Sequence, residues 1–272
     1  TIPSLRERKF DSQLGERQRI SGNGSYTSYL SSYDSDGLKI NGLLTIPDGQ
    51  MPTGGWPAIV FIHGYIPPTQ YQTTTRYQDH VAALARSGFV VFKIDLRGHG
   101  KSEGEPGGGY FGVDYVVDAL NARAALQGAD FVNKDKIGFW GHSMAGNIVL
   151  RSMAARPEIP ASVIWAGAVY TYTDMQEYGI RDNSYTPLPS DTPRQQNRAR
   201  LRELYGNPSK DSWFWQLVAP ANYLKDIKGA LQIDHAINDD VVTIEYSRNL
   251  AKLAEEAKMN FELNEFTSGG HN

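Results

Sequence analysis

The sequence predicts a doubly wound α/β domain on a mostly parallel sheet, with an antiparallel hairpin at its N-terminal side. Short, continuously apolar runs alternate along the chain with segments of helical periodicity, and such runs are typical of strands buried on both faces. Two β-rich runs near the N-terminus flank a turn sequence. A chain of 272 residues is long enough to bury the core of one such domain.

The hairpin comes first and is predicted over residues 26–33 and 38–46, on either side of Asp34-Ser35-Asp36-Gly37. The alternating part then predicts parallel strands, because helical segments connect consecutive strands. Its predicted strands are residues 58–62, 89–94, 137–140, 162–165, 231–233 and 261–266, and its predicted helices are residues 77–86, 113–126, 145–155 and 244–257.

Two segments fall outside this alternation. Residues 1–25 are charged and then rich in Gly and Ser, so we expect an N-terminal arm before a single domain over residues 26–272. Residues 170–218 lie between two core strands and are rich in Tyr, Pro, Asn and Arg. An insertion of this length is too long for an ordinary connection, so we expect it to form a lid.

The composition excludes several classes of function. The net charge is −3 and the charges are mixed along the chain, which argues against nucleic acid as a partner. The sequence holds no run of 18 apolar residues and no Cys, so we expect no membrane span, no disulfide and no thiolate chemistry. The initial Thr and the missing Cys favour a secreted or cell-envelope bacterial protein, although the compartment stays open.

The strongest functional signal is Ser143, which lies between a strand-like run and a helix-like run. The apolar run 137–140 stops at Gly141, and helical periodicity follows Met144 directly. A serine at a sharp strand-to-helix turn is arranged as a nucleophile elbow, with helix-start N–H groups facing any oxyanion formed there. The usual pattern Gly-x-Ser-x-Gly is broken here, because Ala145 occupies its last position.

A strict match to this pattern occurs elsewhere, around Ser102. Ser102 lies seven positions after Asp95, where the preceding predicted strand ends, and a glycine- and proline-rich stretch follows it. Such a stretch cannot begin a helix promptly. We therefore interpret Ser102 as a loop serine and Ser143 as the nucleophile.

A serine nucleophile needs a base within hydrogen-bond reach, and the base needs an orienting group. In a doubly wound sheet such groups lie past the carboxyl ends of strands. His271 follows the last predicted strand on a glycine-bearing loop and is the candidate base. The preceding predicted strand is followed by three candidate acids, Asp234, Asp239 and Asp240. The order Ser–Asp–His along the chain fits hydrolases.

With these residues the chain resembles an α/β-hydrolase fold serine hydrolase, most similar to the prolyl-oligopeptidase-like and dienelactone-hydrolase-like esterase branch. The resemblance covers about residues 38–272. It rests on His63-Gly64, Asp95-Leu96-Arg97-Gly98-His99-Gly100-Lys101-Ser102, Gly141-His142-Ser143-Met144-Ala145-Gly146, Asp239-Asp240-Val241-Val242 and Gly269-Gly270-His271.

The resemblance also implies roles for single residues. The family pattern His-Gly-x-x-Asp-x-x-Val begins here at His235 and selects Asp239 as the acid, with Asp240 as the alternative. The backbone N–H groups of Met144 and Tyr65 are the implied oxyanion donors. The remaining histidines of the family loops, His63, His99 and His142, are expected to bond backbone groups around the site.

The implied function is a serine carboxylesterase acting on small-molecule esters, with no metal and no cofactor. A serine peptidase acting on short peptides or aminoacyl amides is the first alternative, and a non-catalytic binding protein of the same fold is the second. Tyr65, Trp213 and Trp215 are candidates for substrate contact, although lid packing is the favoured interpretation of the two tryptophans and packing at the loop is an equal alternative for Tyr65. No motif indicates an oligomeric state.

Overall fold

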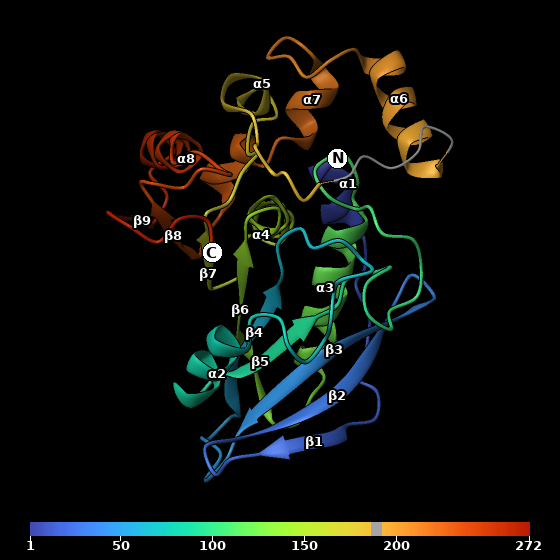
Figure 1. Cartoon of the computed structure of the whole chain (residues 1–272), viewed down its shortest axis with the longest axis vertical. Helices are drawn as coiled ribbons and strands as arrows, with labels where there is room; N and C mark the ends of the chain where they lie inside the picture. The colour runs from blue at the N-terminus through green and yellow to red at the C-terminus, as the bar shows by residue number, and fades with distance from the viewer. Residues whose placement is uncertain (186–191) are drawn as a thin grey trace.

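The computed structural model describes residues 1–185 and 192–272, and this part of the chain contains a nine-stranded sheet (Figure 1). The strands are β1 Gln18–Gly22, β2 Tyr26–Ser35, β3 Leu38–Pro47, β4 Trp56–Ile62, β5 Val90–Ile94, β6 Val132–His142, β7 Ala161–Trp165, β8 Ala230–Ala236 and β9 Phe261–Phe266. Their order in the sheet is β1-β2-β3-β5-β4-β6-β7-β8-β9.

The sheet divides into an antiparallel and a parallel part. Strands β1, β2, β3 and β5 pair antiparallel, whereas β5, β4, β6, β7, β8 and β9 pair parallel. The predicted fold class is therefore confirmed, including the N-terminal hairpin of β2 and β3. The carboxyl ends of the parallel strands meet along one edge, and this edge carries the candidate site.

Helices cover both faces of the sheet. The helices are α1 Ile2–Glu7, α2 Gln78–Arg86, α3 Asp114–Gln127, α4 Ala145–Ala155, α5 Asp174–Tyr178, α6 Pro193–Tyr205, α7 Trp213–Val218 and α8 Glu245–Glu256, with a 3₁₀ helix η1 at Pro220–Asp226. Apolar residues of α3, α4 and α8 belong to the main core cluster. The α2 residues Val81 and Ala85 pack in a second cluster on the other face, with Phe61, Val91 and Trp140.

The N-terminal segment is more ordered than the expected arm. Ile2 and Leu5, three positions apart on α1, are buried in the main core, and the Thr1 side chain caps the helix. Strand β1 extends the sheet beside β2, although all five of its residues are exposed. A strand held by backbone pairing alone has no apolar alternation, so hydrophobic patterning could not predict it.

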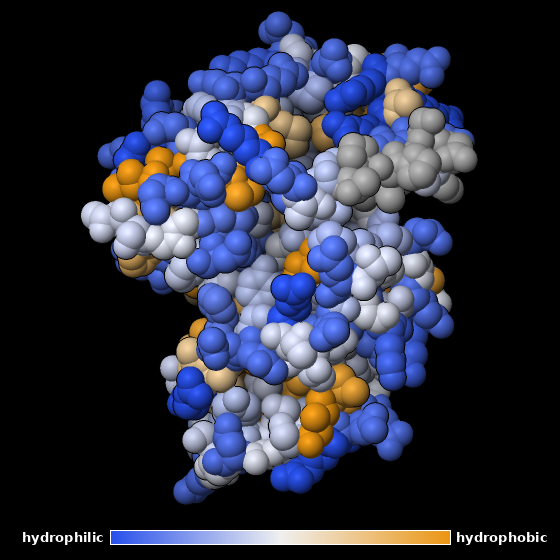
Figure 2. All heavy atoms as spheres, viewed as in Figure 1, coloured by the Kyte–Doolittle hydropathy of each residue, from blue (hydrophilic) through white to orange (hydrophobic). Residues whose placement is uncertain are grey.

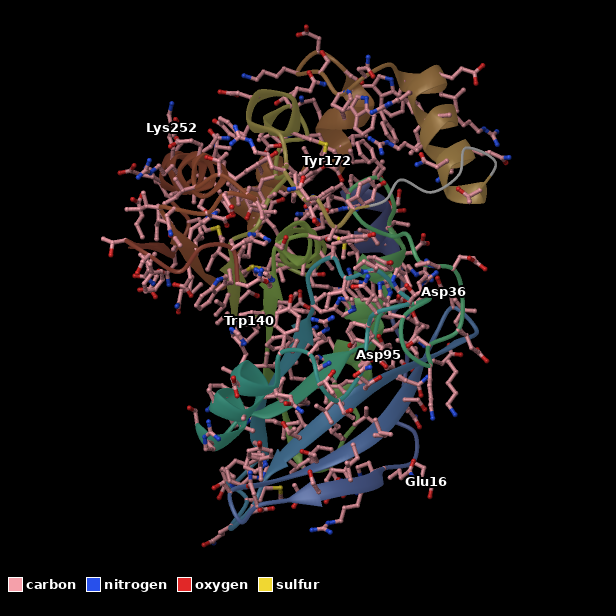
Figure 3. The ribbon with its side chains drawn as sticks, in the orientation of Figure 1. Glu16, Asp36, Asp95, Trp140, Tyr172 and Lys252 are labelled. Atoms are coloured by element: carbon pink, nitrogen blue, oxygen red, sulfur yellow. The ribbon has the colours of Figure 1, made fainter. Side chains whose placement is uncertain are left out.

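The insertion between β7 and β8 is helical where it is described. It contributes α5, α6 and α7, which lie together at one end of the molecule (Figure 1). Tyr172 lies close to these helices (Figure 3), and its ring contacts Trp215 of α7 at a centroid distance of 5.5 Å. Within the described ranges, no helix has the length and apolar character needed to cross a membrane.

Candidate active site

The elbow at Ser143 has the geometry that the sequence predicts. Strand β6 ends at His142 and α4 begins at Ala145, so two residues make the whole turn. Ser143 has a φ of 55°, in the left-handed region that a residue with a Cβ seldom adopts. Its N–H donates to the carbonyl of Trp165 at 2.9 Å and its carbonyl accepts from Gly146 at 2.9 Å. Such strain persists only where the surrounding structure enforces it.

Packing explains why the elbow motif tolerates alanine at position 145. A Cβ on Gly146 would lie 2.8 Å from the Cα of Gly167, and a Cβ on Gly141 would lie 2.6 Å from a methyl of Val149. Ala145 itself is fully buried and fits without conflict. The close approach of α4 to the segment after β7 therefore falls at Gly146, one position later than the last glycine of the usual motif.

Ser143, His271 and Asp239 form a continuous hydrogen-bonded chain. His271 Nε2 lies 2.9 Å from Ser143 Oγ, and His271 Nδ1 lies 2.8 Å from Asp239 Oδ2. Because an ionised carboxylate only accepts, the proton sits on Nδ1 and Nε2 is free to accept from the serine hydroxyl. Asp240, the alternative acid, is exposed and lines the cleft beside the site.

Asp239 is held by more groups than the triad requires. Its Oδ1 accepts from the N–H groups of Val241 and Val242, both at 2.9 Å. His235 Nε2 lies 3.2 Å from Oδ2, while its Nδ1 lies 2.7 Å from Ser247 Oγ. Burial raises the pKa of Asp239, but the hydrogen bonds from His235, His271 and the backbone outweigh it, so the pKa falls well below its ordinary value. The carboxylate therefore stays ionised at neutral pH.

A second chain of hydrogen bonds joins the Gly64 backbone to the backbone of His271. Gly64 N–H donates to Tyr77 Oη at 3.0 Å, and Tyr77 Oη lies 2.8 Å from His142 Nδ1. His142 Nε2 lies 2.6 Å from the carbonyl of His271. Since that carbonyl can only accept, His142 carries its proton on Nε2 and Nδ1 accepts from the tyrosine.

The pKa values of His142 and Tyr77 support these proton positions in the second hydrogen-bond chain, which we call the relay. Burial, with the neighbouring His271 adding to it, lowers the pKa of His142 to about 3. Burial raises the pKa of Tyr77 to about 12. Both groups are therefore neutral near pH 7. The sequence predicted that His142 bonds the backbone near the site, but it did not indicate Tyr77, which lies in no motif.

The loop after β4 approaches the elbow closely. A Cβ on Gly64 would lie 3.1 Å from Ser143 Cβ, from His142 Nδ1 and from Tyr77 Oη. Asp95, which follows β5, anchors the later part of this loop. Its carboxylate accepts hydrogen bonds from the hydroxyls of Tyr71 at 2.8 Å and Thr73 at 2.6 Å. Asp95 and Trp140 are labelled in the middle of Figure 3, between the insertion and the lower strands.

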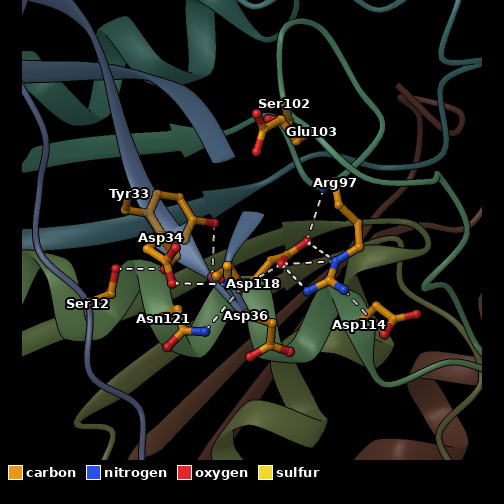
Figure 4. Close-up of polar contacts among 12 residues, drawn as sticks. Ser12, Tyr33, Asp34, Asp36, Arg97, Ser102, Glu103, Asp114, Asp118 and Asn121 are labelled. Carbon is orange, nitrogen blue, oxygen red and sulfur yellow. Dashed lines mark hydrogen bonds and ion pairs between the residues drawn. The ribbon is translucent and has the colours of Figure 1, made fainter. Parts of the chain in front are cut away.

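Ser102 has a structural partner away from the elbow. Its Oγ accepts from the N–H of Asn41 at 2.9 Å. The loop that carries it is fixed by the buried ion pair of Arg97 and Asp118, 2.6 Å apart (Figure 4). Asp118 also accepts from Ser35 at 2.7 Å, so α3, β2 and this loop are joined.

Two hollows meet at Ser143. A cleft of about 990 Å³ includes His271 and the start of α2, and Figure 2 shows the outline of the molecule indented between α2 and the C-terminal elements. A smaller pocket of about 350 Å³ includes Met144. Tyr65 lines both hollows, and its contact with substrate stays a prediction.

Trp213 and Trp215 differ from the expectation that they contact substrate, because neither lines the cleft or the smaller pocket. Trp215 is buried and its Nε1 donates to the carbonyl of Gly206 at 3.1 Å. Trp213 is 64% exposed and its ring contacts Tyr205. Both tryptophans pack within the insertion, which is one of the two interpretations that the sequence allowed. Among the described residues, no cluster of His, Asp and Glu is arranged to hold a metal ion.

The fold and this site define a serine-hydrolase architecture, and comparison with known proteins identifies the family. Residues 57–272 match the family model for serine aminopeptidase S33, so the chain belongs to this hydrolase family. It is similar to the uncharacterized peptidase YtmA of Bacillus subtilis, with 25% identity over 223 residues that cover 80% of this chain and 76% of the relative.

Solved structures of the same fold include esterases and peptidases. The acetyl xylan esterase of Paenibacillus sp. R4 aligns over 100% of this chain and 87% of its own, with a TM-score of 0.68 and 16% identity. The acylaminoacyl peptidase of Pyrococcus horikoshii has a TM-score of 0.69 and 17% identity over 91% of this chain, which spans 38% of that protein. The fold of this chain is thus shared with esterases and with peptidases.

Proposed function

We propose that this protein is a serine carboxylesterase with Ser143 as nucleophile, His271 as general base and Asp239 as the orienting acid. The observation that carries the proposal is the hydrogen-bonded chain from Ser143 through His271 to Asp239, with both contacts below 3 Å. The left-handed backbone of Ser143 supports it, because strain of this kind concentrates at functional sites.

The reaction follows from the proton positions. His271 Nε2 takes the hydroxyl proton as Ser143 Oγ bonds to the ester carbonyl carbon, and the carbonyl oxygen becomes an oxyanion. The N–H groups of Met144 and Tyr65 are the proposed donors to this oxyanion. The C–O bond to the alcohol then breaks, and His271 returns the proton to the departing oxygen. Water attacks the acyl-enzyme with His271 again as base, which releases the carboxylic acid and restores Ser143.

A serine peptidase is the second candidate. The name of the family model and the peptidases among the similar proteins favour it. The same residues would serve, because His271 would protonate a departing amine in place of an alcohol. An amine is a poorer leaving group than an alcohol, so amide cleavage would depend more strongly on this proton transfer from His271.

Paired kinetics separate the candidates. We expect 4-nitrophenyl acetate to be hydrolysed with a higher kcat/KM than alanine 4-nitroanilide, and Ser143→Ala to abolish both activities. Ser102→Ala is the matched control, since its hydroxyl bonds Asn41 and should leave turnover intact. A kcat/KM for the anilide equal to that for the ester would favour the peptidase, and full activity in Ser143→Ala would refute both.

A further inference from the structure

We propose that the pocket of about 350 Å³ beside Met144 binds the acyl part of the ester and favours an aromatic acyl group, while the wide cleft beside His271 takes the alcohol part. This inference rests on the proposed esterase function and adds the direction in which the substrate lies and the class of acid that it contains.

The direction follows from the position of the proton donor. In the acylation step His271 Nε2 must reach the oxygen of the departing alcohol, so the alcohol lies on the histidine side of Ser143. His271 lines the wide cleft and not the smaller pocket, whereas Met144 lines the smaller pocket and not the cleft. The acyl substituent, which points away from the departing group, therefore enters the pocket beside Met144.

The chemistry of the two hollows fits this division. The pocket is lined largely by aromatic rings and thioethers, namely Tyr65, Tyr110, Phe111, Tyr185, Met144 and Met175. Aromatic groups prefer edge-to-face contacts of this kind, and sulfur packs well against ring edges. Tyr65 and Tyr185 already meet edge-on, with ring centroids 5.4 Å apart.

The cleft, in contrast, combines apolar rings such as those of Trp140 and Trp165 with exposed polar side chains, which come from the start of α2 and the residues just before it and from the segment after α5. Arg76, Gln78 and Asp79 come from the first of these regions, and Arg181 and Asn183 from the second. Its volume of about 990 Å³ lies near the upper end of the range of roughly 300–1,000 Å³ for ligand pockets. A large alcohol that carries both polar and apolar groups therefore fits on this side.

The insertion closes the pocket on the acyl side. Met175 of α5 and Arg198 of α6 both line it. The guanidinium of Arg198 lies 4.2 Å from the centre of the Phe111 ring, which joins the insertion to the loop before α3. An acetyl group would leave most of this volume empty, whereas an arylpropanoyl group reaches from Ser143 to the rings.

The test keeps the alcohol constant and varies the acid. In the intact chain, kcat/KM is measured for the 4-methylumbelliferyl esters of acetate, butyrate and 3-phenylpropanoate. We expect the phenylpropanoate to exceed the acetate by more than about tenfold. Met175→Trp, which fills the pocket, should lower this ratio by about tenfold or more. Ile180→Trp fills the same pocket from another position and provides a second test.

Met51→Trp is the matched control. Met51 is 47% exposed and lines neither hollow, so the same substitution there should leave the acyl ratio unchanged. If acetate is hydrolysed but the ratio is near one, or does not respond to Met175→Trp and Ile180→Trp, the acyl assignment is overturned and the esterase proposal stands. If wild type hydrolyses none of the three esters, the proposed function itself fails, and this inference fails with it.

Discussion

Replacing Tyr77 by phenylalanine removes the hydroxyl that joins the Gly64 loop to the histidine before the nucleophile. The ring remains, and so do its edge contacts with Phe61, Trp140 and His142. Two hydrogen bonds disappear, one of 3.0 Å from Gly64 N–H and one of 2.8 Å to His142 Nδ1. The change therefore tests the relay and leaves the packing intact.

The expected loss of stability follows from the groups left behind. Gly64 N–H and His142 Nδ1 lose their partner, and a buried polar group without a partner costs about 1–3 kcal/mol. Two such groups are left, so we expect the free energy of unfolding to fall by about 2–6 kcal/mol. The loop beyond Gly64 carries the proposed donor at Tyr65, so we also expect kcat to fall by about tenfold. This is less than the roughly 10²–10³ that complete loss of an oxyanion donor costs.

Urea unfolding and steady-state ester hydrolysis check the two numbers. Tyr29→Phe is the matched control, because the Tyr29 hydroxyl makes no hydrogen bond within residues 1–185 and 192–272, and it should change neither quantity. The reasoning is refuted if Tyr77→Phe matches wild type in both kcat and stability. A rise in KM with an unchanged kcat would also contradict it, because the relay is argued to position the donor and not to bind the substrate.

Three further predictions concern the acid, the buried histidine and the elbow. Asp239→Asn should lower kcat by about 10⁴ and Asp240→Asn by less than tenfold, and equal losses in ester hydrolysis would invalidate the choice of acid. The pKa of His142 falls from 6.5 in the unfolded chain to about 3 in the folded one, so the unfolded chain binds the extra proton and stability decreases on acidification between these values. The slope is at most about 1.4 kcal/mol per pH unit. His142→Gln should reduce this slope of the free energy of unfolding against pH, measured by urea unfolding between about pH 6.5 and 4.5. This window lies above the pH range in which Asp239 loses its contribution to stability. An unchanged slope would argue against the buried neutral histidine. Gly146→Ala should lower the free energy of unfolding by about 1–3 kcal/mol, because the new Cβ would meet Gly167 Cα at 2.8 Å. Ala145→Gly should lower it by about 1 kcal/mol and keep activity. Thermal unfolding that finds Ala145→Gly less stable than Gly146→Ala would contradict this packing.

The sequence predicted the parts of the structure that leave a local signature. Buried parallel strands give continuous apolar runs, which is why β4 and β5 could be placed before the structure was known. The elbow combines such a run with an immediate helix start, so Ser143 stood out although Ala145 breaks the motif. His271 could be proposed because it lies just past the end of a strand.

The remaining features depend on contacts between distant segments. Strand β1 has no apolar face, and only its pairing with β2 defines it. Tyr77 bridges Gly64 and His142, which are 13 positions before it and 65 after it in the chain. His235, near the end of β8, supports Asp239 through a side-chain contact, and the family pattern that gave the spacing of these two residues did not indicate this contact. Trp213 and Trp215 contact other residues of the insertion, namely Tyr205 and Gly206. Composition alone could not distinguish such packing from contact with a substrate.

The central claim is that Ser143 is the nucleophile activated by His271, and covalent labelling tests it most directly. A fluorophosphonate probe is added to the intact chain, and the modified peptide is identified by mass spectrometry. We predict a single adduct on the peptide that carries Ser143, with labelling strongly slowed in His271→Ala because the base that lies 2.9 Å from Ser143 Oγ is removed. An adduct on Ser102, or labelling of Ser143→Ala at the wild-type rate, would contradict the account.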